Sequence, residues 1–221
     1  MKKLAVIFLM LLFMSPVNAR TNYDTEEQRN IIVYERISPA IVSIVAQLKD
    51  GVSEGTGCIV NKNGLILTGF HVVEGAKEIE VTTSNGQTYK AVFLAKPENK
   101  KDLALIKIDP KNIMPTVTFA DSEDVKVGQK VLTIGNPFGF SHTLTQGIIS
   151  RIDYVKNRFQ TDAAINPGCS GGPVLNSSGE VIGISQSIYN PDHNISNIGI
   201  GFAIPSNEAV KFITSADTKK K

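Results

Sequence analysis

Residues that bind metals or act as bases near neutral pH are scarce in this sequence. Its 221 residues include three histidines, at positions 71, 142 and 193, and two cysteines, at positions 58 and 169. His142 and His193 lie among turn-forming residues, which favours solvated loops. Neither has a second histidine or cysteine at the spacing of a metal site. We therefore expect no bound metal and no cofactor.

Long apolar runs are also scarce, and the one extended run lies at the N-terminus. It extends from Leu4 to Met14 after two lysines and is followed by small residues up to Ala19. This run is too short for a membrane-spanning helix, which needs about 20 residues, and the pattern is typical of a secretory signal peptide. We predict a signal peptide over residues 1–19 and export to the periplasm or the exterior. An uncut N-terminal anchor is the alternative.

An excess of charge of one sign is absent as well. The chain has 23 lysines and arginines and 21 aspartates and glutamates, and cleavage after Ala19 removes only Lys2 and Lys3, which leaves 21 of each sign. A dedicated nucleic-acid-binding protein would need a basic face to offset phosphate charge, so we expect no nucleic-acid partner. The roughly 200 remaining residues are enough for one large domain or two small lobes.

Short β-strand patterns dominate what the sequence does contain. Asn-Gly pairs within residues 61–65 and 83–87 are strong hairpin signals. Many segments are rich in β-branched residues and are mostly separated by Gly, Asn, Pro or Asp, namely residues 40–48, 57–60, 65–68, 78–83, 90–95, 103–108, 130–134, 143–150, 180–188 and 198–204. This pattern predicts an all-β barrel or sandwich and not a parallel α/β sheet.

Helical patterns occur only near the two ends of the exported chain, at residues 24–37 and 206–213. The polar, turn-rich stretch 120–129 divides the strands into two groups of similar size. We therefore expect two barrels, at about 38–119 and 130–205, joined by this linker.

Cys169 and Ser170 are adjacent potential nucleophiles in the glycine-rich stretch "DAAINPGCSGGPVLN". A serine hydroxyl needs an adjacent base, usually a histidine that is oriented by a carboxylate. His71 directly follows an apolar strand pattern and Asp102 opens another, so we expect both side chains at strand ends. The N–H groups of Gly168 and Ser170 can converge in such a turn, as an oxyanion hole requires.

Six motifs together resemble the HtrA (Deg) family of trypsin-like serine proteases. They are, in order, "TGFHVV", "DLALIKI", "IGNPFGF", "TDAAINPGCSGGPVLN", "GEVIGI" and "GIGFAIPSN". The resemblance runs from about residue 34 to residue 213, and the chain order His, Asp, Ser makes it far more specific than a G-x-S-G-G motif alone. It implies an all-β fold of two six-stranded antiparallel β-barrels, with the active site between them and short helices at both ends.

Motif by motif, the resemblance also implies a catalytic role for individual residues. His71 matches the general base and Asp102 its orienting partner. Ser170 matches the nucleophile, and the amides of Gly168 and Ser170 match the oxyanion hole. The implied enzyme is a serine endopeptidase, a hydrolase that works through an acyl-enzyme.

The two cysteines mark a departure from the family. Cys169 stands where the family usually has asparagine, and its side chain is expected to point away from the cleaved bond, which leaves Ser170 as the nucleophile. In the family fold the strand that holds Cys58 passes near the nucleophile loop. We therefore expect a Cys58–Cys169 disulfide, with two separate buried thiols as the alternative.

The resemblance also places a substrate pocket beside the nucleophile. Its expected residues are Ala164, Ile184, Ser185, Gln186, Gly199 and Gly201. No acid lies at the expected base, so a basic substrate side chain would bury an unpaired charge. We expect cleavage after small or medium aliphatic residues of unfolded or loosely folded proteins, as in quality control of the cell envelope.

Assembly and alternative functions stay open at this point. The sequence ends soon after the last family motif, so we expect no PDZ domain within it. Residues 23–36 are expected either to form a homotrimer contact, as is common in the family, or to pack as a helix on their own domain. The alternatives to an envelope protease are a non-catalytic, chaperone-like binding protein and a secreted protease that acts outside the cell.

Overall fold

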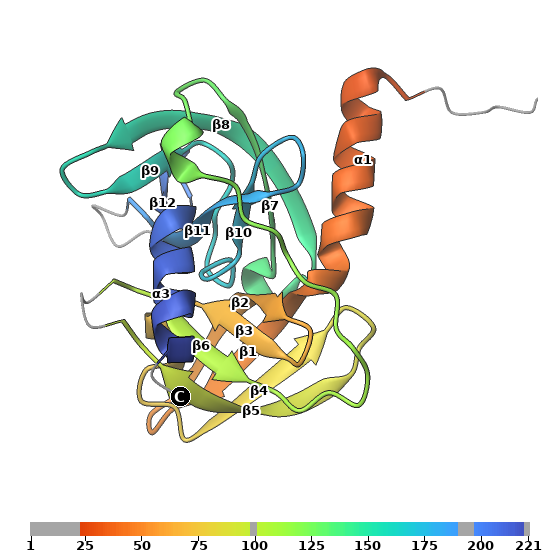
Figure 1. Ribbon diagram of the computed structural model, residues 1–221, viewed down its shortest axis with the longest axis vertical. Helices are drawn as coiled ribbons and strands as arrows, with labels where there is room; N and C mark the ends of the chain where they lie inside the picture. Colours follow the sequence, from red (N-terminus) through yellow and green to blue (C-terminus); the bar gives the residue numbers. More distant parts are fainter. Residues whose placement is uncertain (1–22, 98–100, 190–196, 219–221) are drawn as a thin grey trace, which may run out of the picture.

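The computed structural model describes residues 23–97, 101–189 and 197–218, which form two closed barrels of six strands each (Figure 1). Neighbouring strands are antiparallel in both barrels. The expected double barrel is therefore confirmed. The expected signal peptide, residues 1–19, and His193 lie outside the described residues.

The first barrel closes in the order β1-β2-β3-β6-β5-β4, with β4 paired back to β1. Its strands are β1 (Ile41–Gln47), β2 (Val52–Asn61), β3 (Leu65–Thr68), β4 (Glu78–Thr83), β5 (Thr88–Ala95) and β6 (Ala104–Lys107). The two expected Asn-Gly turns join β2 to β3 and β4 to β5. Gly64 and Gly86 in these turns have φ angles of +88° and +80°, in the left-handed region that glycine adopts without a steric penalty.

The second barrel closes in the order β10-β11-β12-β9-β8-β7. Its strands are β7 (Lys130–Gly135), β8 (Thr143–Asp153), β9 (Arg158–Thr161), β10 (Pro173–Leu175), β11 (Val181–Ile188) and β12 (Gly201–Pro205). The short strands β9 and β10 were not expected from the sequence. The strand expected at 198–204 begins only at Gly201, because Gly199 has a φ angle of +85° and cannot continue an extended chain.

Three clusters of buried apolar side chains stabilise this arrangement. One fills the first barrel, with Ile66 and Ile106 at its centre, and one fills the second barrel, around Val131 and Ile149. The third joins the barrels, since it combines side chains such as Leu105 of β6 with side chains such as Ile134 of β7. The two barrels therefore share a core, which fixes the position of one relative to the other.

Helices lie at both ends of the described chain. Helix α1 (Thr25–Ile37) begins at a capping box in which Asp24 accepts hydrogen bonds from the N–H groups of Glu26 and Glu27. It lies beside β8 in Figure 1 and buries Val33 and Ile37 against its own chain. Helix α3 (Ser206–Thr218) runs along the opposite side of the molecule and reaches the first barrel (Figure 1). No helix among the described residues has the length and apolar character to cross a membrane.

Candidate active site

His71 and Asp102 meet because their strands are neighbours in the first barrel. Strand β3 ends at Thr68, which pairs with Ala104 at the beginning of β6. His71 follows β3 on the one-turn helix α2 (Phe70–Val73), and Asp102 precedes β6 by two residues. The end of one strand and the beginning of its antiparallel neighbour therefore place the two side chains at the same rim of the barrel.

The Asp102 carboxylate contacts His71 twice. Its Oδ2 lies 2.5 Å from Nδ1 of the ring, and its Oδ1 accepts the backbone N–H of His71 at 2.8 Å. A carboxylate only accepts hydrogen bonds, so Nδ1 carries the proton and Nε2 presents its lone pair on the far side of the ring. This is the tautomer that a general base requires.

The same contacts determine the charge of Asp102. Burial by itself would raise the pKa of this carboxyl group, but hydrogen bonds from the ring and backbone of His71, the charge of His71 and the N–H of Phe70 lower the pKa below its ordinary value. Asp102 is therefore ionised at neutral pH and can stabilise a positive charge on the imidazole.

Ser170 lies in the loop between β9 and β10, in the second barrel. Its Oγ donates to the backbone carbonyl of Gln186 at 3.3 Å, and no hydrogen bond joins it to His71 within the described residues. A contact of this kind often forms only when substrate is present. The side chain of the third residue of the expected triad is thus bonded to Gln186 in this structure, and not to His71 as the resemblance implies.

The turn before Ser170 leaves the N–H of Gly168 without an acceptor. The carbonyl of Pro167 accepts the N–H of Phe138 at 3.0 Å. A trans peptide directs its N–H opposite to its C=O, so the Gly168 N–H points away from this contact, and no protein acceptor meets it in the part of the chain that the structure describes. Gly168 has a φ angle of +96°, and a β-carbon there would collide with the carbonyl of Asn136.

The N–H of Ser170 lacks an acceptor in the described structure for the same geometric reason. The carbonyl of Cys169 accepts the Ser185 hydroxyl at 2.5 Å and the N–H of Gly172 at 3.0 Å. The Ser170 N–H therefore points to the opposite side of that peptide and meets no protein acceptor among the described residues. Two such N–H groups, at Gly168 and Ser170, are the donors that an oxyanion hole needs.

The expected substrate pocket is only partly right. The side chain of Ile184 is fully buried (0% exposed) in the cluster between the barrels, and the Ser185 hydroxyl is turned towards the carbonyl of Cys169. Ile184 therefore points into the core, and Ser185, on the other face of β11, has its hydroxyl bonded within the nucleophile loop. Along β11, Gln186 is the first residue of the expected pocket that is partly exposed.

The residues expected on the other side of the pocket adjoin Ile165, a buried side chain (1% exposed) that the sequence analysis did not name. Ala164 is half-buried, and its carbonyl accepts the Thr145 hydroxyl at 3.1 Å. The side chain of Ile165, the next residue, packs against Gly201, whereas Gly199 faces open space. The sequence could have indicated Ile165, because it directly follows Ala164, the expected base of the pocket.

The expected disulfide is absent from the structure, since Cys58 and Cys169 are both free and buried. The Cys58 thiol lies 3.8 Å from the carbonyl oxygen of Gly171, and the Cys169 side chain packs against Gly135. Burial raises the pKa of both thiols, and for Cys169 a backbone hydrogen bond from Asn166 offsets part of this rise. Two separate buried thiols, the alternative reading of the sequence, describe this arrangement.

His142 was expected to be a solvated loop residue, and the structure contradicts this expectation. Its backbone N–H donates to the side-chain oxygen of Asn136 at 2.9 Å, and its ring Nε2 lies 3.0 Å from the carbonyl of Ile41 in the first barrel. The residue is half-buried and has a φ angle of +58°. His142 therefore ties the loop after β7 to β1, a role that turn composition alone did not indicate.

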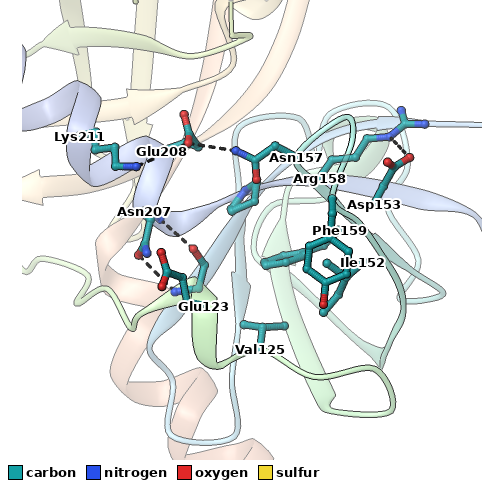
Figure 2. A pocket seen from close by; sticks show the side chains of 13 residues that line it. Glu123, Val125, Ile152, Asp153, Asn157, Arg158, Phe159, Asn207, Glu208 and Lys211 are labelled. Atoms are coloured by element: carbon teal, nitrogen blue, oxygen red, sulfur yellow. Dashed lines mark hydrogen bonds and ion pairs between the residues drawn. The ribbon is translucent and has the colours of Figure 1, made fainter.

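Two pockets lie close to the elements described above. One of about 540 Å³ lies beside His71 and Asp102 and is lined by Phe70, Glu74, Lys96, Pro97 and Lys101. The other, of about 280 Å³, lies between the β8–β9 hairpin, the linker and α3 (Figure 2). The second pocket includes none of the expected catalytic residues.

A family comparison agrees with this geometry. The model of the trypsin-like peptidase domain matches residues 55–184, more than half of the chain. The chain belongs to this family. The matched range begins on β2 and ends on β11, so it includes the His–Asp pair and the loop that carries Ser170.

Curated relatives of this chain are proteases by name, several of them called DegP-like or Do-like. A probable periplasmic serine endoprotease, DegP-like, of Halomonas elongata is 47% identical over 164 residues, which are 72% of this chain and 34% of the relative. The chloroplastic protease Do-like 1 of Arabidopsis thaliana is 37% identical over 213 residues, 86% of this chain and 47% of the relative. The chain thus spans between a third and a half of the length of these relatives.

A solved structure shows the same fold. The HtrA-type protease AlgW with a tripeptide superimposes with a TM-score of 0.77 at 36% sequence identity, covering 84% of this chain and 62% of that one.

Proposed function

We propose that this chain is a serine endopeptidase of the HtrA type that hydrolyses peptide bonds through an acyl-enzyme. The observation that carries the proposal is the turn around Ser170, which leaves the N–H groups of Gly168 and Ser170 without protein acceptors in the described structure. This turn lies in the same molecule as a His71–Asp102 pair of the correct tautomer. Together they supply the base, the nucleophile and the oxyanion donors of peptide hydrolysis.

In the proposed reaction, the Ser170 hydroxyl leaves its contact with Gln186 and turns towards Nε2 of His71. The ring takes the proton as Oγ attacks the substrate carbonyl, and Asp102 stabilises the imidazolium. The two N–H groups bind the developing oxyanion. His71 then gives the proton to the leaving amine, and a water molecule hydrolyses the acyl-enzyme by the same steps.

The proposed substrates are unfolded or loosely folded polypeptides in the periplasm. The names of the relatives support the location, since several are called periplasmic endoproteases. The absence of an acid in residues 163–165 supports cleavage after small or medium aliphatic residues.

A second candidate function is a binding protein that holds unfolded chains without cutting them. The observation in its favour is the Ser170 hydroxyl, which is bonded to Gln186 and not to His71. In that case an extended chain would pair with the end of β11 at residues 186–188, beyond the residues that pair with β10, and dissociate intact.

Fluorophosphonate labelling separates the two candidates. The probe is added to residues 20–221, and the product is analysed by intact mass and peptide mapping, with Ser170→Ala as the matched control. We expect stoichiometric labelling at Ser170 that is absent from the control. Absence of labelling in the wild-type protein, together with binding of an unfolded polypeptide such as casein, would instead support the binding protein.

A further inference from the structure

Thr56 lies on β2 of the first barrel, yet it bonds to the turn that carries the nucleophile in the second barrel. Its N–H donates to the carbonyl of Ser170 at 2.9 Å, and its hydroxyl donates to the carbonyl of Gly168 at 2.6 Å. The residue is fully buried (0% exposed). One residue of the first barrel thus contacts the turn at both of the residues whose N–H groups have no acceptor in the described structure, through its backbone at Ser170 and through its hydroxyl at Gly168.

The direction of the Thr56 hydroxyl is determined by Asn136, which directly follows β7. The backbone N–H and the side-chain Nδ2 of Asn136 donate to Thr56 Oγ1 at 3.1 and 3.0 Å. A hydroxyl has two acceptor positions and one hydrogen. Because both acceptor positions are occupied, the single hydrogen is directed at the carbonyl of Gly168.

The Asn136 side chain has no freedom to release this hydroxyl. Its Nδ2 also donates to the carbonyl of Val42 at 3.1 Å, and its Oδ1 accepts the N–H of His142 at 2.9 Å. The residue is buried (4% exposed), and its contacts with Val42 and Thr56 are shielded from water. The chain of hydrogen bonds from β1 and the loop after β7 therefore ends at Gly168.

The peptide that Thr56 holds lies between the two peptides with unpaired N–H groups. Its carbonyl, at Gly168, accepts the Thr56 hydroxyl, and its N–H, at Cys169, donates to the carbonyl of Asn166 at 2.9 Å. With both of its polar groups bonded, this peptide cannot rotate without breaking two buried hydrogen bonds. Its neighbours share α-carbons with it, so fixing its plane also limits the directions of the N–H groups of Gly168 and Ser170.

The geometry points to Thr56 as a positioning residue that holds the oxyanion hole in its working arrangement from the opposite barrel. This inference rests on the proposed peptidase function and adds to it. Thr56 does not touch the reacting atoms. Its hydroxyl acts through Gly168, and its effect is therefore expected on the transition state, where the oxyanion forms, and not on the binding of substrate.

The test is a steady-state comparison of Thr56→Val, Thr56→Ser and the wild-type protein on a quenched-fluorescence peptide with valine before the cleaved bond. Valine has the shape of threonine and lacks the hydroxyl. We expect Thr56→Val to lower kcat by about ten- to hundredfold, at or below the roughly 10²–10³-fold cost of removing an oxyanion donor itself, with KM changed less than about threefold. Thr56→Ser retains the hydroxyl and should restore kcat to within about threefold of wild type.

A matched control is Thr133→Val, which removes a hydroxyl from another buried threonine (2% exposed) on β7. We expect its kinetics to match wild type. If Thr56→Val does not fold, Thr56→Ala serves in its place, because it removes the hydroxyl without placing a methyl group against the Gly168 carbonyl. Thermal melting of each variant identifies the folded ones.

The outcomes separate this inference from the proposed function. An active wild-type protein whose Thr56→Val variant keeps its kcat within twofold, or whose Thr56→Ser variant is as slow as Thr56→Val, overturns the positioning role and leaves the peptidase intact. A wild-type protein that neither cleaves the peptide nor reacts with a fluorophosphonate overturns the proposed function itself, and the inference with it.

Discussion

The thiol of Cys169 packs against Gly135, whereas the hydroxyl of its neighbour Ser170 is partly exposed and bonded only to a backbone carbonyl. The two adjacent nucleophiles therefore occupy different environments. Burial also raises the pKa of the Cys169 thiol, which keeps it protonated and poorly nucleophilic.

We therefore predict opposite results for substitution at these two neighbours. Cys169→Ala is expected to retain kcat/KM within about fivefold of wild type, because only packing is lost, whereas Ser170→Ala should lower it by about 10⁴-fold or more. Peptide cleavage rates measure both. Alkylation with iodoacetamide provides a second check, since neither cysteine should label until the protein is unfolded. Rapid labelling of Cys169 in the native protein, or an inactive Cys169→Ala, would contradict this assignment.

Asp102 gives a prediction about pH. The pKa of this carboxyl group is lower in the folded protein than its ordinary value of 3.8, so the folded state binds its proton less readily than the unfolded state does. The resulting stabilisation is fully present above the ordinary value and is lost as the pH falls through the folded-state value. We expect wild type to lose unfolding free energy more steeply than Asp102→Asn between about pH 4 and pH 2.

Urea denaturation at several pH values measures this difference. Asp109→Asn, which changes an exposed carboxyl group near the end of β6, is the control and should keep the wild-type slope. Equal slopes for Asp102→Asn and wild type would show that the contacts with His71 do not favour the charged carboxylate.

The residues of the expected triad could be proposed from the sequence because each lies in a motif with a fixed order along the chain. Thr56, Asn136 and the role of His142 could not. Their importance depends on contacts between the barrels, such as the bond from Thr56 to Gly168 across 112 positions of sequence. Local composition carries no information about such contacts.

At the scale of elements, helix α3 connects the two barrels through Glu208 in its first turn. Glu208 accepts a hydrogen bond from Asn157 of the β8–β9 hairpin at 3.0 Å and pairs with Lys101 of the first barrel at 3.4 Å. Figure 2 shows the Asn157 contact at one wall of the pocket. Lys101 directly precedes Asp102 in the chain, so this ion pair anchors the segment that carries the orienting carboxylate.

A double-mutant cycle tests this anchor. Glu208→Gln and Lys101→Met are compared singly and together by urea denaturation at neutral pH. Both side chains are mostly buried (17% and 22% exposed), so we expect a coupling free energy of about 0.5–1 kcal/mol, at the upper end for partly exposed pairs. Lys211→Met is the control, since Lys211 lies 3.9 Å from the same carboxylate but is 75% exposed. A coupling indistinguishable from that of the control would contradict the anchor.

Most strands were predictable from the sequence, and the exceptions have physical reasons. The longer strands alternate buried and exposed side chains or have β-branched runs, as β1 does. Strand β10 has three residues, all buried, and its proline and valine follow the glycines of the nucleophile turn. Strand β9 has four residues and begins with an arginine whose guanidinium lies 3.8 Å from the ring of Phe202. Segments this short take their conformation from their neighbours.

At the scale of the whole molecule, the cluster of apolar side chains between the barrels decides how the protein unfolds. This cluster contains Leu67 and Leu105 from the first barrel and Leu132 and Ile134 from the second. Each barrel therefore completes its own packing with side chains of the other. Separating the barrels would expose this surface and break the buried hydrogen bonds between Thr56 and its partners.

We accordingly predict that both barrels unfold in one transition. Ile134→Ala removes a fully buried side chain of β7 and should lower the unfolding free energy by about 2–5 kcal/mol, whereas Ile134→Val, the matched control, should lower it by about 0.5–1.5 kcal/mol. Hydrogen exchange followed by mass spectrometry reports each barrel separately. The loss of protection should be equal in peptides that cover β3 and in peptides that cover β11. A loss confined to the second barrel would mean that each barrel is stable without the other, and the site between them would then depend on docking of two independent units.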